Sequence, residues 1–116
     1  MALRPEILRY KKDFDRLYKK GRSAGDRFVV VFYIPNGLGY SRRAFLASKK
    51  VGGAVARNRA RRLMKESFRR IESDLLTGRD ILFIARREAA DAGLQEVETS
   101  MRRAINKCGL IKQNNK

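Results

Sequence analysis

The segment Phe28–Ile34, which reads FVVVFYI, constrains the fold more than any other part of the chain. β-Branched and aromatic residues in such a run predict a β-strand. Successive side chains of a strand point to opposite faces, and here both sets are apolar. One face carries Phe28, Val30, Phe32 and Ile34, and the other carries Val29, Val31 and Tyr33. Both faces therefore need cover, from helices or from a ligand.

Hydrophobic spacing predicts three helices around this strand. They cover Lys11–Lys20, about Ala54 to Leu75, and about Leu94–Lys107. Two more strands are expected: an antiparallel return over Ser41–Ser48 and a short buried strand over Ile81–Ala85. Residues 49–51 could add a further short pairing. The expected fold class is α+β, a small α/β sandwich in the order α-β-β-(β)-α-β-α, with helices packed against one sheet.

The length of 116 residues suits a single domain, which we place at residues 1–116. Residues 1–9 are expected to form an extended N-terminal segment. Residues 110–116 are expected to form a flexible basic tail. No repeat or linker divides the chain.

The segment Lys49–Arg70 gathers positive charge on one helix. At about 100° per residue, an apolar stripe lies on one side and a basic face on the other. The stripe consists of Ala56, Ala60, Leu63, Met64, Ser67, Phe68 and Ile71, and the basic face consists of Asn58, Arg61, Arg62, Lys65 and Arg69. Arginine and lysine at this spacing suit the phosphates of a folded nucleic acid. A helix lying on lipid is disfavoured, because tryptophan anchors are lacking.

The composition points the same way and excludes several kinds of chemistry. The net charge of +16 calls for a polyanionic partner. The chain has no histidine and one cysteine, Cys108, so Ser-His and Cys-His nucleophile pairs and zinc sites built on His or Cys are excluded. A lone thiol at an apolar helical position is expected to be buried, and it is compatible with a reducing cytosol. No stretch approaches the ~20 apolar residues of a membrane span, so we expect a cytoplasmic chain without a membrane partner.

Two aromatic residues of the first helix have two readings. Phe14 and Tyr18 stand at i and i+4 and share one helix face. Spacing alone favours a role in the core. Flanking lysines make base stacking in a single-stranded nucleic acid the alternative.

The sequence also resembles a known family, the bacterial ribonuclease P protein subunit. The resemblance is carried by Val55–Leu63, VARNRARRL, preceded by Ser48–Gly52, SKKVG. Upstream, Lys12–Phe14 and Tyr18–Gly21 are similar to the first helix of the family, and Ile81–Arg86 to its last strand. The resemblance covers nearly the whole chain, from about Arg9 to Gly109.

The resemblance implies a fold and an activity. The fold would be ribosomal protein S5 domain 2-like, with a left-handed βαβ crossover through the basic helix. The activity would be that of ribonuclease P: a catalytic RNA subunit holds Mg²⁺ and removes the 5′ leader of precursor tRNA, while the protein binds. No catalytic residue, no metal site and no obligate protein partner are expected on this chain.

The resemblance further implies two binding surfaces. The RNA subunit would contact Lys49, Lys50, Arg57, Asn58, Arg59, Arg61, Arg62, Lys65 and Arg69. The leader would lie between the first helix and the sheet, against Phe14, Tyr18, Val31, Tyr33, Arg86 and Arg87. Val31 stands where the family often has an aromatic residue, and Tyr33, which shares its strand face, is the substitute.

Two other functions compete with this one. A structural RNA-binding protein of ribosomal type would share the charge and size but would not need an aromatic cleft. A protein nuclease would need a histidine or a carboxylate cluster. Glu66 and Glu72 do not share a helix face, which argues against the nuclease.

Overall fold

The computed structural model describes residues 4–112. Its helices are α1 (Lys11–Lys20), α2 (Ala54–Ile71) and α3 (Leu94–Lys107), with short 3-10 helices η1 (Glu72–Asp74) and η2 (Arg87–Asp91). Its strands are β1 (Arg22–Gly25), β2 (Val29–Pro35), β3 (Arg42–Leu46) and β4 (Arg79–Ala85). The three expected helices are confirmed, and α1 and α3 have the predicted bounds. Helix α2 ends at Ile71, earlier than expected, and η1 carries the chain on toward the buried Leu75.

The four strands form one mixed sheet in the order β1-β2-β4-β3. Strand β4 pairs antiparallel with β2 and parallel with β3, so β3, α2 and β4 form a βαβ unit. Strands β2 and β3 do run in opposite directions, as expected, but β4 lies between them. The two most apolar strands take the centre, where both faces are covered, and β3, which begins with Arg42 and Arg43, takes an edge.

The additional pairing expected at residues 49–51 was placed wrongly. Those residues form a turn, closed by a hydrogen bond of 3.0 Å from the Val51 amide to the Ser48 carbonyl. The fourth strand is β1 instead, which pairs with β2 from Arg22↔Tyr33 to Gly25↔Val30. The sequence RSAG of β1 has neither the alternation nor the β-branched residues that predict a strand.

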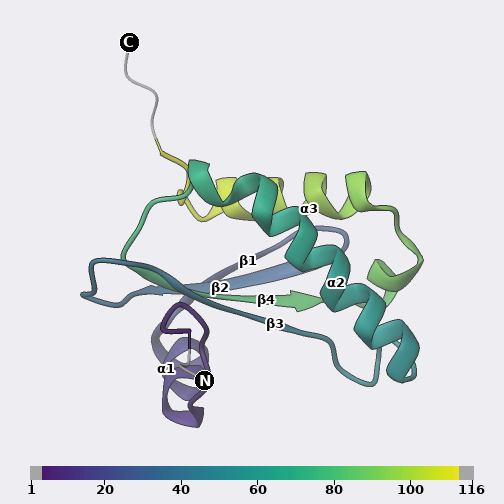
Figure 1. The fold of residues 1–116 in the computed structure, drawn as a ribbon, viewed down its shortest axis with the longest axis horizontal. Helices are drawn as coiled ribbons and strands as arrows, with labels where there is room; N and C mark the ends of the chain where they lie inside the picture. The colour runs from purple at the N-terminus through teal and green to yellow at the C-terminus, as the bar shows by residue number, and fades with distance from the viewer. Residues whose placement is uncertain (1–3, 113–116) are drawn as a thin grey trace.

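Helices cover both faces of the sheet, as the apolar strand predicts (Figure 1). Helices α2 and α3 pack on one face over the larger core, which contains Val31, Met64 and Phe83. Helix α1 packs on the other face over a smaller cluster of Leu8, Leu17, Ala44 and Leu82, with Phe32 at its margin. Successive residues of β2 therefore belong to different cores. We call the side that carries α1 the α1 face of the sheet.

Both ends of the described chain are tied to the sheet or the helices. The Arg43 amide donates to the Glu6 carbonyl at 2.8 Å and the Leu8 amide donates to the Arg43 carbonyl at 2.9 Å, so the N-terminal segment extends the β3 edge. Leu110 is buried, and Ile111 forms a bridge with Leu75. The expected tail therefore does not begin at residue 110, and its residues 113–116 lie outside the described part. Across residues 4–112, no helix has the length and apolarity that a membrane crossing demands.

Candidate nucleic-acid interface

Helix α2 presents a broad basic face to solvent because its apolar stripe faces the sheet. Ala60, Met64 and Phe68 are among the buried residues of α2. The exposed side chains on the opposite side include Asn58, Arg59, Arg62, Lys65 and Arg69, while Arg57 and Arg61 are half-buried at its border. This placement confirms the predicted division of the helix into an apolar and a basic side.

Much of this charge is unpaired. Among the described residues, Arg57, Arg62 and Lys65 form no ion pair. Arg69 lies 3.3 Å from Glu66, but both side chains are largely exposed, and such a pair contributes little. The face is therefore available to a polyanion.

The turn before α2 adds two lysines to the same region. The Lys50 amide donates to the Ser48 hydroxyl at 3.3 Å, and the Lys49 carbonyl accepts from the Gly52 amide at 3.1 Å. This geometry places exposed Lys49 and Lys50 beside the N-terminus of the helix. The first turn of α2 contains no acidic residue, so the helix dipole adds to the positive potential there.

The side chains of two residues in the Arg57–Asn58–Arg59 triplet form hydrogen bonds within the protein. Arg59 donates from Nε to the Ala90 carbonyl at 2.7 Å, which ties α2 to η2. Asn58 accepts a hydrogen bond from Arg61 through its Oδ1. Sequence reasoning treated Arg59 only as a contact to RNA; the structure shows that it also positions η2.

A second surface lies on the α1 face. Tyr18 packs against Phe32 of β2 with ring centroids 5.2 Å apart and ring planes at 75°, yet 49% of Tyr18 stays exposed. Phe14 is half-buried at the margin of the same apolar cluster. Phe14 therefore contributes to packing, as the spacing favours, and Tyr18 keeps an open side; base stacking by the pair stays a prediction.

Val31 and Tyr33 do not join this surface. Val31 has no exposed area and belongs to the core under α2 and α3, against which Tyr33 also packs. The physical reason is strand alternation: residues 31 and 33 point away from α1, and residue 32 points toward it. Placing Val31 and Tyr33 in a cleft beside α1 was therefore wrong. Phe32 is the aromatic residue of β2 on that side, and the alternation in the sequence already separates it from Val31.

The α1 face continues into a depression of about 660 Å³ at the end of β4. Its apolar floor includes Val30 and Ile84, and its rim carries basic residues and one acidic residue. These rim residues are Arg27, Lys50, Arg86, Arg87 and Glu88. Arg86 and Arg87 are exposed, and the Arg86 amide donates to the Phe28 carbonyl at 2.8 Å, which fixes the chain where it leaves β4.

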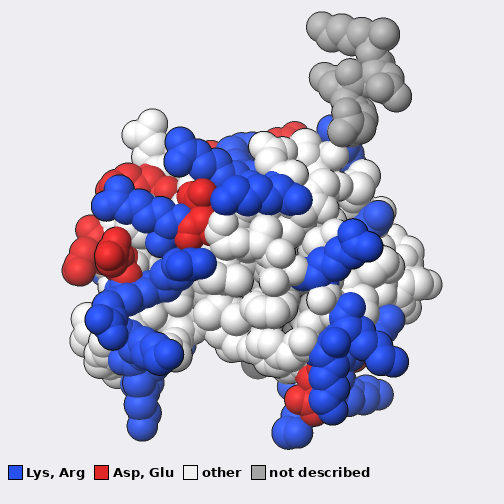
Figure 2. All heavy atoms as spheres, turned by 180° about the vertical axis from the view of Figure 1, so that it is seen from behind, with Lys and Arg blue, Asp and Glu red and all other residues white. Residues whose placement is uncertain are grey.

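Figure 2 views the molecule from behind and shows how charge is distributed on that side. Lys and Arg side chains gather at the two lower corners, where α1 and the start of α2 lie when Figure 1 is turned, and a band of uncharged surface separates them. An uncharged band between basic borders suits a strand of nucleic acid whose bases are unpaired.

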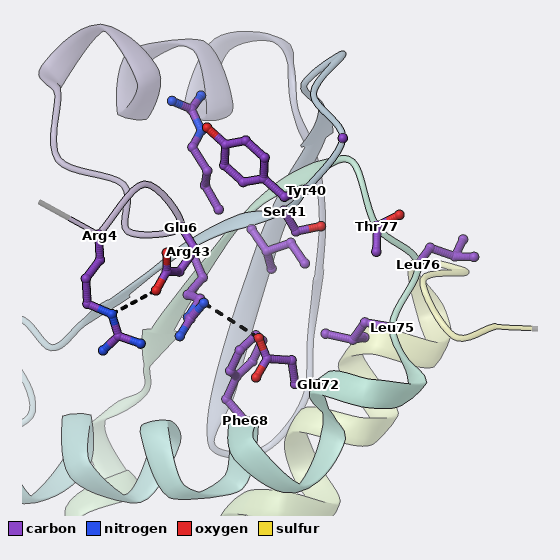
Figure 3. A pocket seen from close by; sticks show the side chains of 13 residues that line it. Arg4, Glu6, Tyr40, Ser41, Arg43, Phe68, Glu72, Leu75, Leu76 and Thr77 are labelled. Carbon is purple, nitrogen blue, oxygen red and sulfur yellow. Dashed lines mark hydrogen bonds and ion pairs between the residues drawn. The ribbon is translucent and has the colours of Figure 1, made fainter.

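A second hollow, of about 370 Å³, lies between the β3 edge and the end of α2 (Figure 3). Four of its charged side chains form two pairs, Arg43 with Glu72 at 3.6 Å and Arg4 with Glu6 at 2.8 Å, and the fifth, Arg42, pairs with Asp80 at 2.7 Å. The Arg43 guanidinium also lies over the Phe68 ring, 5.0 Å from its centroid. These pairs leave little net charge to attract an anion.

The titratable groups of the described residues include no cluster of the metal-binding kind. Within residues 4–112, no group of three or more His, Cys, Asp or Glu residues could hold a metal ion. Cys108 is half-buried rather than fully buried, and burial raises the pKa of its thiol. The charge of the two basic surfaces favours binding of a polyanion.

Comparison with known proteins decides among the functions that such surfaces allow. A family model described as ribonuclease P matches residues 3–109. The chain belongs to the ribonuclease P protein family. The ribonuclease P protein component of Thermoanaerobacter sp. (strain X514) is 40% identical to it in an alignment 116 residues long, which covers 98% of this chain and 100% of that protein.

Solved structures of ribonuclease P proteins share its fold. The protein from Staphylococcus aureus superposes with a TM-score of 0.84 at 31% identity, over 94% of this chain and 100% of that one. The protein from Thermotoga maritima gives 0.76 at 30% identity, over 84% and 93%. The expected family, the α+β fold and the role as a subunit of the ribonuclease P holoenzyme are confirmed. The family also decides against the ribosomal-type alternative.

Proposed function

We propose that this ribonuclease P protein binds the catalytic RNA subunit with α2 and holds the 5′ leader of precursor tRNA on the α1 face. The observation that carries the proposal is the separation of two basic surfaces, of which one alone has exposed aromatic area. Duplex and folded RNA present phosphates, whereas a single strand also presents bases.

The RNA subunit faces the exposed side of α2 and the lysines before it. Arg57, Arg62 and Lys65 are free to neutralise phosphates, and each neutralised phosphate releases counterions. Arginine forks give two parallel hydrogen bonds to one phosphate. The remaining residues of the proposed contact are Lys49, Lys50, Asn58, Arg59, Arg61 and Arg69.

The leader lies in the cleft between α1 and the sheet. Tyr18 offers a half-exposed ring for a base, and Phe32 supports that ring from below. Arg86 and Arg87 lie on the rim of the depression, where they can contact the leader phosphates. Lys50 lines the same depression and also precedes α2, so it connects the two surfaces.

In this proposal the protein positions the substrate, and Mg²⁺ on the RNA subunit supplies the activated water. The products are a leader with a 3′-hydroxyl and a tRNA with a 5′-phosphate. The chain contributes affinity for both partners, and the proposal needs no second protein. The proposed compartment is the cytoplasm.

The test is the affinity of the assembled holoenzyme for precursor tRNA with leaders of increasing length. Affinity should rise as the leader grows and then level off when the cleft is filled. The gain should vanish for the RNA subunit alone. Equal affinities for leader-bearing and mature tRNA would contradict the leader assignment, and failure of the protein to bind the RNA subunit would contradict the α2 assignment.

A further inference from the structure

Asp80 of β4 is a buried carboxylate with only 1% of its surface exposed. Its two oxygens accept hydrogen bonds from Arg42, from Nε at 2.8 Å and from Nη2 at 2.7 Å. Asn36, after β2, donates a third bond from Nδ2 at 3.0 Å. A buried charge is tolerated only when it is paired and hydrogen-bonded, and the guanidinium fork provides this. Arg42 is therefore held in one orientation.

The same guanidinium also reaches α1. Arg42 Nη2 lies 3.4 Å from Oδ1 of Asp13, whose side chain is only 12% exposed. Arg42 is itself mostly buried, so solvent screens this contact less than it screens the surface pairs of the molecule. The hydrogen bonds and the charge of Asp80 raise the pKa of the Arg42 guanidinium above its ordinary value. One arginine thus bridges the centre of the sheet and the first turn of α1.

Helix α1 has few other attachments. It has ten residues, which is too short for a stable isolated helix in water. Leu17 is its one buried residue, and Phe14 is half-buried. Arg16 adds a bond of 3.2 Å to the Pro35 carbonyl, on an exposed side chain. The orientation of α1 over the sheet therefore depends on a small set of contacts, and the Arg42 bridge is the buried polar one.

We propose that Arg42 is a positioning residue: by bridging Asp80 and Asp13, it fixes α1 over the sheet and so sets the separation of Tyr18 from Phe32. Asp13 lies in the turn before Tyr18, so a change at the bridge moves the aromatic side of the cleft relative to β2. The part of this inference that concerns the leader rests on the proposed function. The part that concerns α1 does not.

The tests are three variants and a matched control. Asp13→Asn removes one end of the bridge. Arg42→Lys keeps a cation beside Asp80, but a single ammonium cannot bond both Asp80 oxygens and Asp13. The double variant completes a mutant cycle. Asp15→Asn is the control, because it removes the same charge from the same helix at an exposed pair with Lys11 (3.1 Å).

The first readout is hydrogen exchange of the α1 amides in the free protein, which needs no RNA. Exchange should speed up about three- to tenfold in Asp13→Asn and in Arg42→Lys, and the double variant should show less than the product of the two effects. Exchange in α2 and α3 should not change. If the α1 amides of both single variants exchange at the same rate as those of Asp15→Asn, the proposal is overturned.

The second readout is holoenzyme affinity for leader-bearing and mature tRNA. Asp13→Asn should weaken the affinity for leader-bearing substrate by roughly three- to tenfold. The affinities for mature tRNA and for the RNA subunit should not change. Faster α1 exchange without this loss would overturn the link from α1 to the cleft. If the unaltered protein shows no leader preference, the proposed function fails, and the exchange data still decide whether Arg42 positions α1.

Discussion

Tyr18 of α1 packs edge-on against Phe32 of β2, with the ring centroids 5.2 Å apart, and half of the Tyr18 surface remains open. The contact joins the first helix to the sheet and leaves one aromatic side for a ligand. It makes Tyr18 the most direct probe of the leader cleft.

Tyr18→Ala should weaken binding of leader-bearing precursor tRNA by about 1–3 kcal/mol, because one stacking partner is lost. Affinity for the RNA subunit should not change. Tyr40→Ala is the matched control, since Tyr40 is 43% exposed but lies in the loop between β2 and β3. Equilibrium binding of both RNAs checks the prediction, and equal losses in the two variants would argue against it.

Arg62→Ala should flatten the salt dependence of binding to the RNA subunit. Loss of one phosphate contact lowers the log–log slope by about 0.7–0.9. Arg103→Ala removes an exposed arginine from α3 and should leave the slope unchanged. Affinities measured over a series of salt concentrations give both slopes. An unchanged slope in Arg62→Ala would remove this residue from the interface.

Gly21→Ala should destabilise the protein by about 1–3 kcal/mol. A Cβ at this position would collide with the Leu17 carbonyl oxygen of α1 and stand 2.9 Å from the Tyr33 carbonyl oxygen of β2, so relief requires a shift of α1 or β2. Gly39→Ala is the control, because nothing lies within 4 Å of its added Cβ. Denaturant unfolding of the two variants provides the comparison, and equal stability would contradict the close packing at the end of α1.

Asp26 should make stability sensitive to acid. Burial raises the pKa of its carboxyl, but hydrogen bonds from the Arg27 amide and Ser100, together with the charge of Lys107, outweigh burial and hold the pKa below the ordinary 3.8. A lowered pKa in the folded state contributes stability that is present above the ordinary value and is lost as the pH falls through it and below. Asp26→Asn should therefore flatten the acid limb of the stability curve, measured by unfolding below roughly pH 5. An unaltered limb would contradict this.

Local features of the sequence predicted the helices well. Periodic apolar residues set the bounds of α1 and α3, and Gly109, which has a φ of 70°, ends α3 in the left-handed conformation. Which strands lie side by side was harder to predict, because strand pairing is non-local. Strand β3 lies beside β4, which follows it in the chain only after the whole of α2. No local pattern in the chain marks β1 as a strand.

For the binding surfaces, too, local features were predicted and contacts between distant parts of the chain were not. The basic side of α2 follows from helical spacing alone. The assignment of Val31 failed by one residue, and in a strand a shift of one residue moves a side chain to the opposite face. The bonds of Arg59 to Ala90 and of Arg42 to Asp80 and Asp13 join residues distant in the chain, so only the fold reveals them.

The proposed role of this chain is to assist a catalytic RNA in cleaving precursor tRNA. Its most direct test is the rate of leader removal by a bacterial ribonuclease P RNA at low Mg²⁺, with and without the protein. The rate should be faster with the protein, and Tyr18→Ala should remove most of that increase when the concentration of precursor tRNA is limiting. An unchanged rate, with the folded protein bound to the RNA subunit, would contradict it.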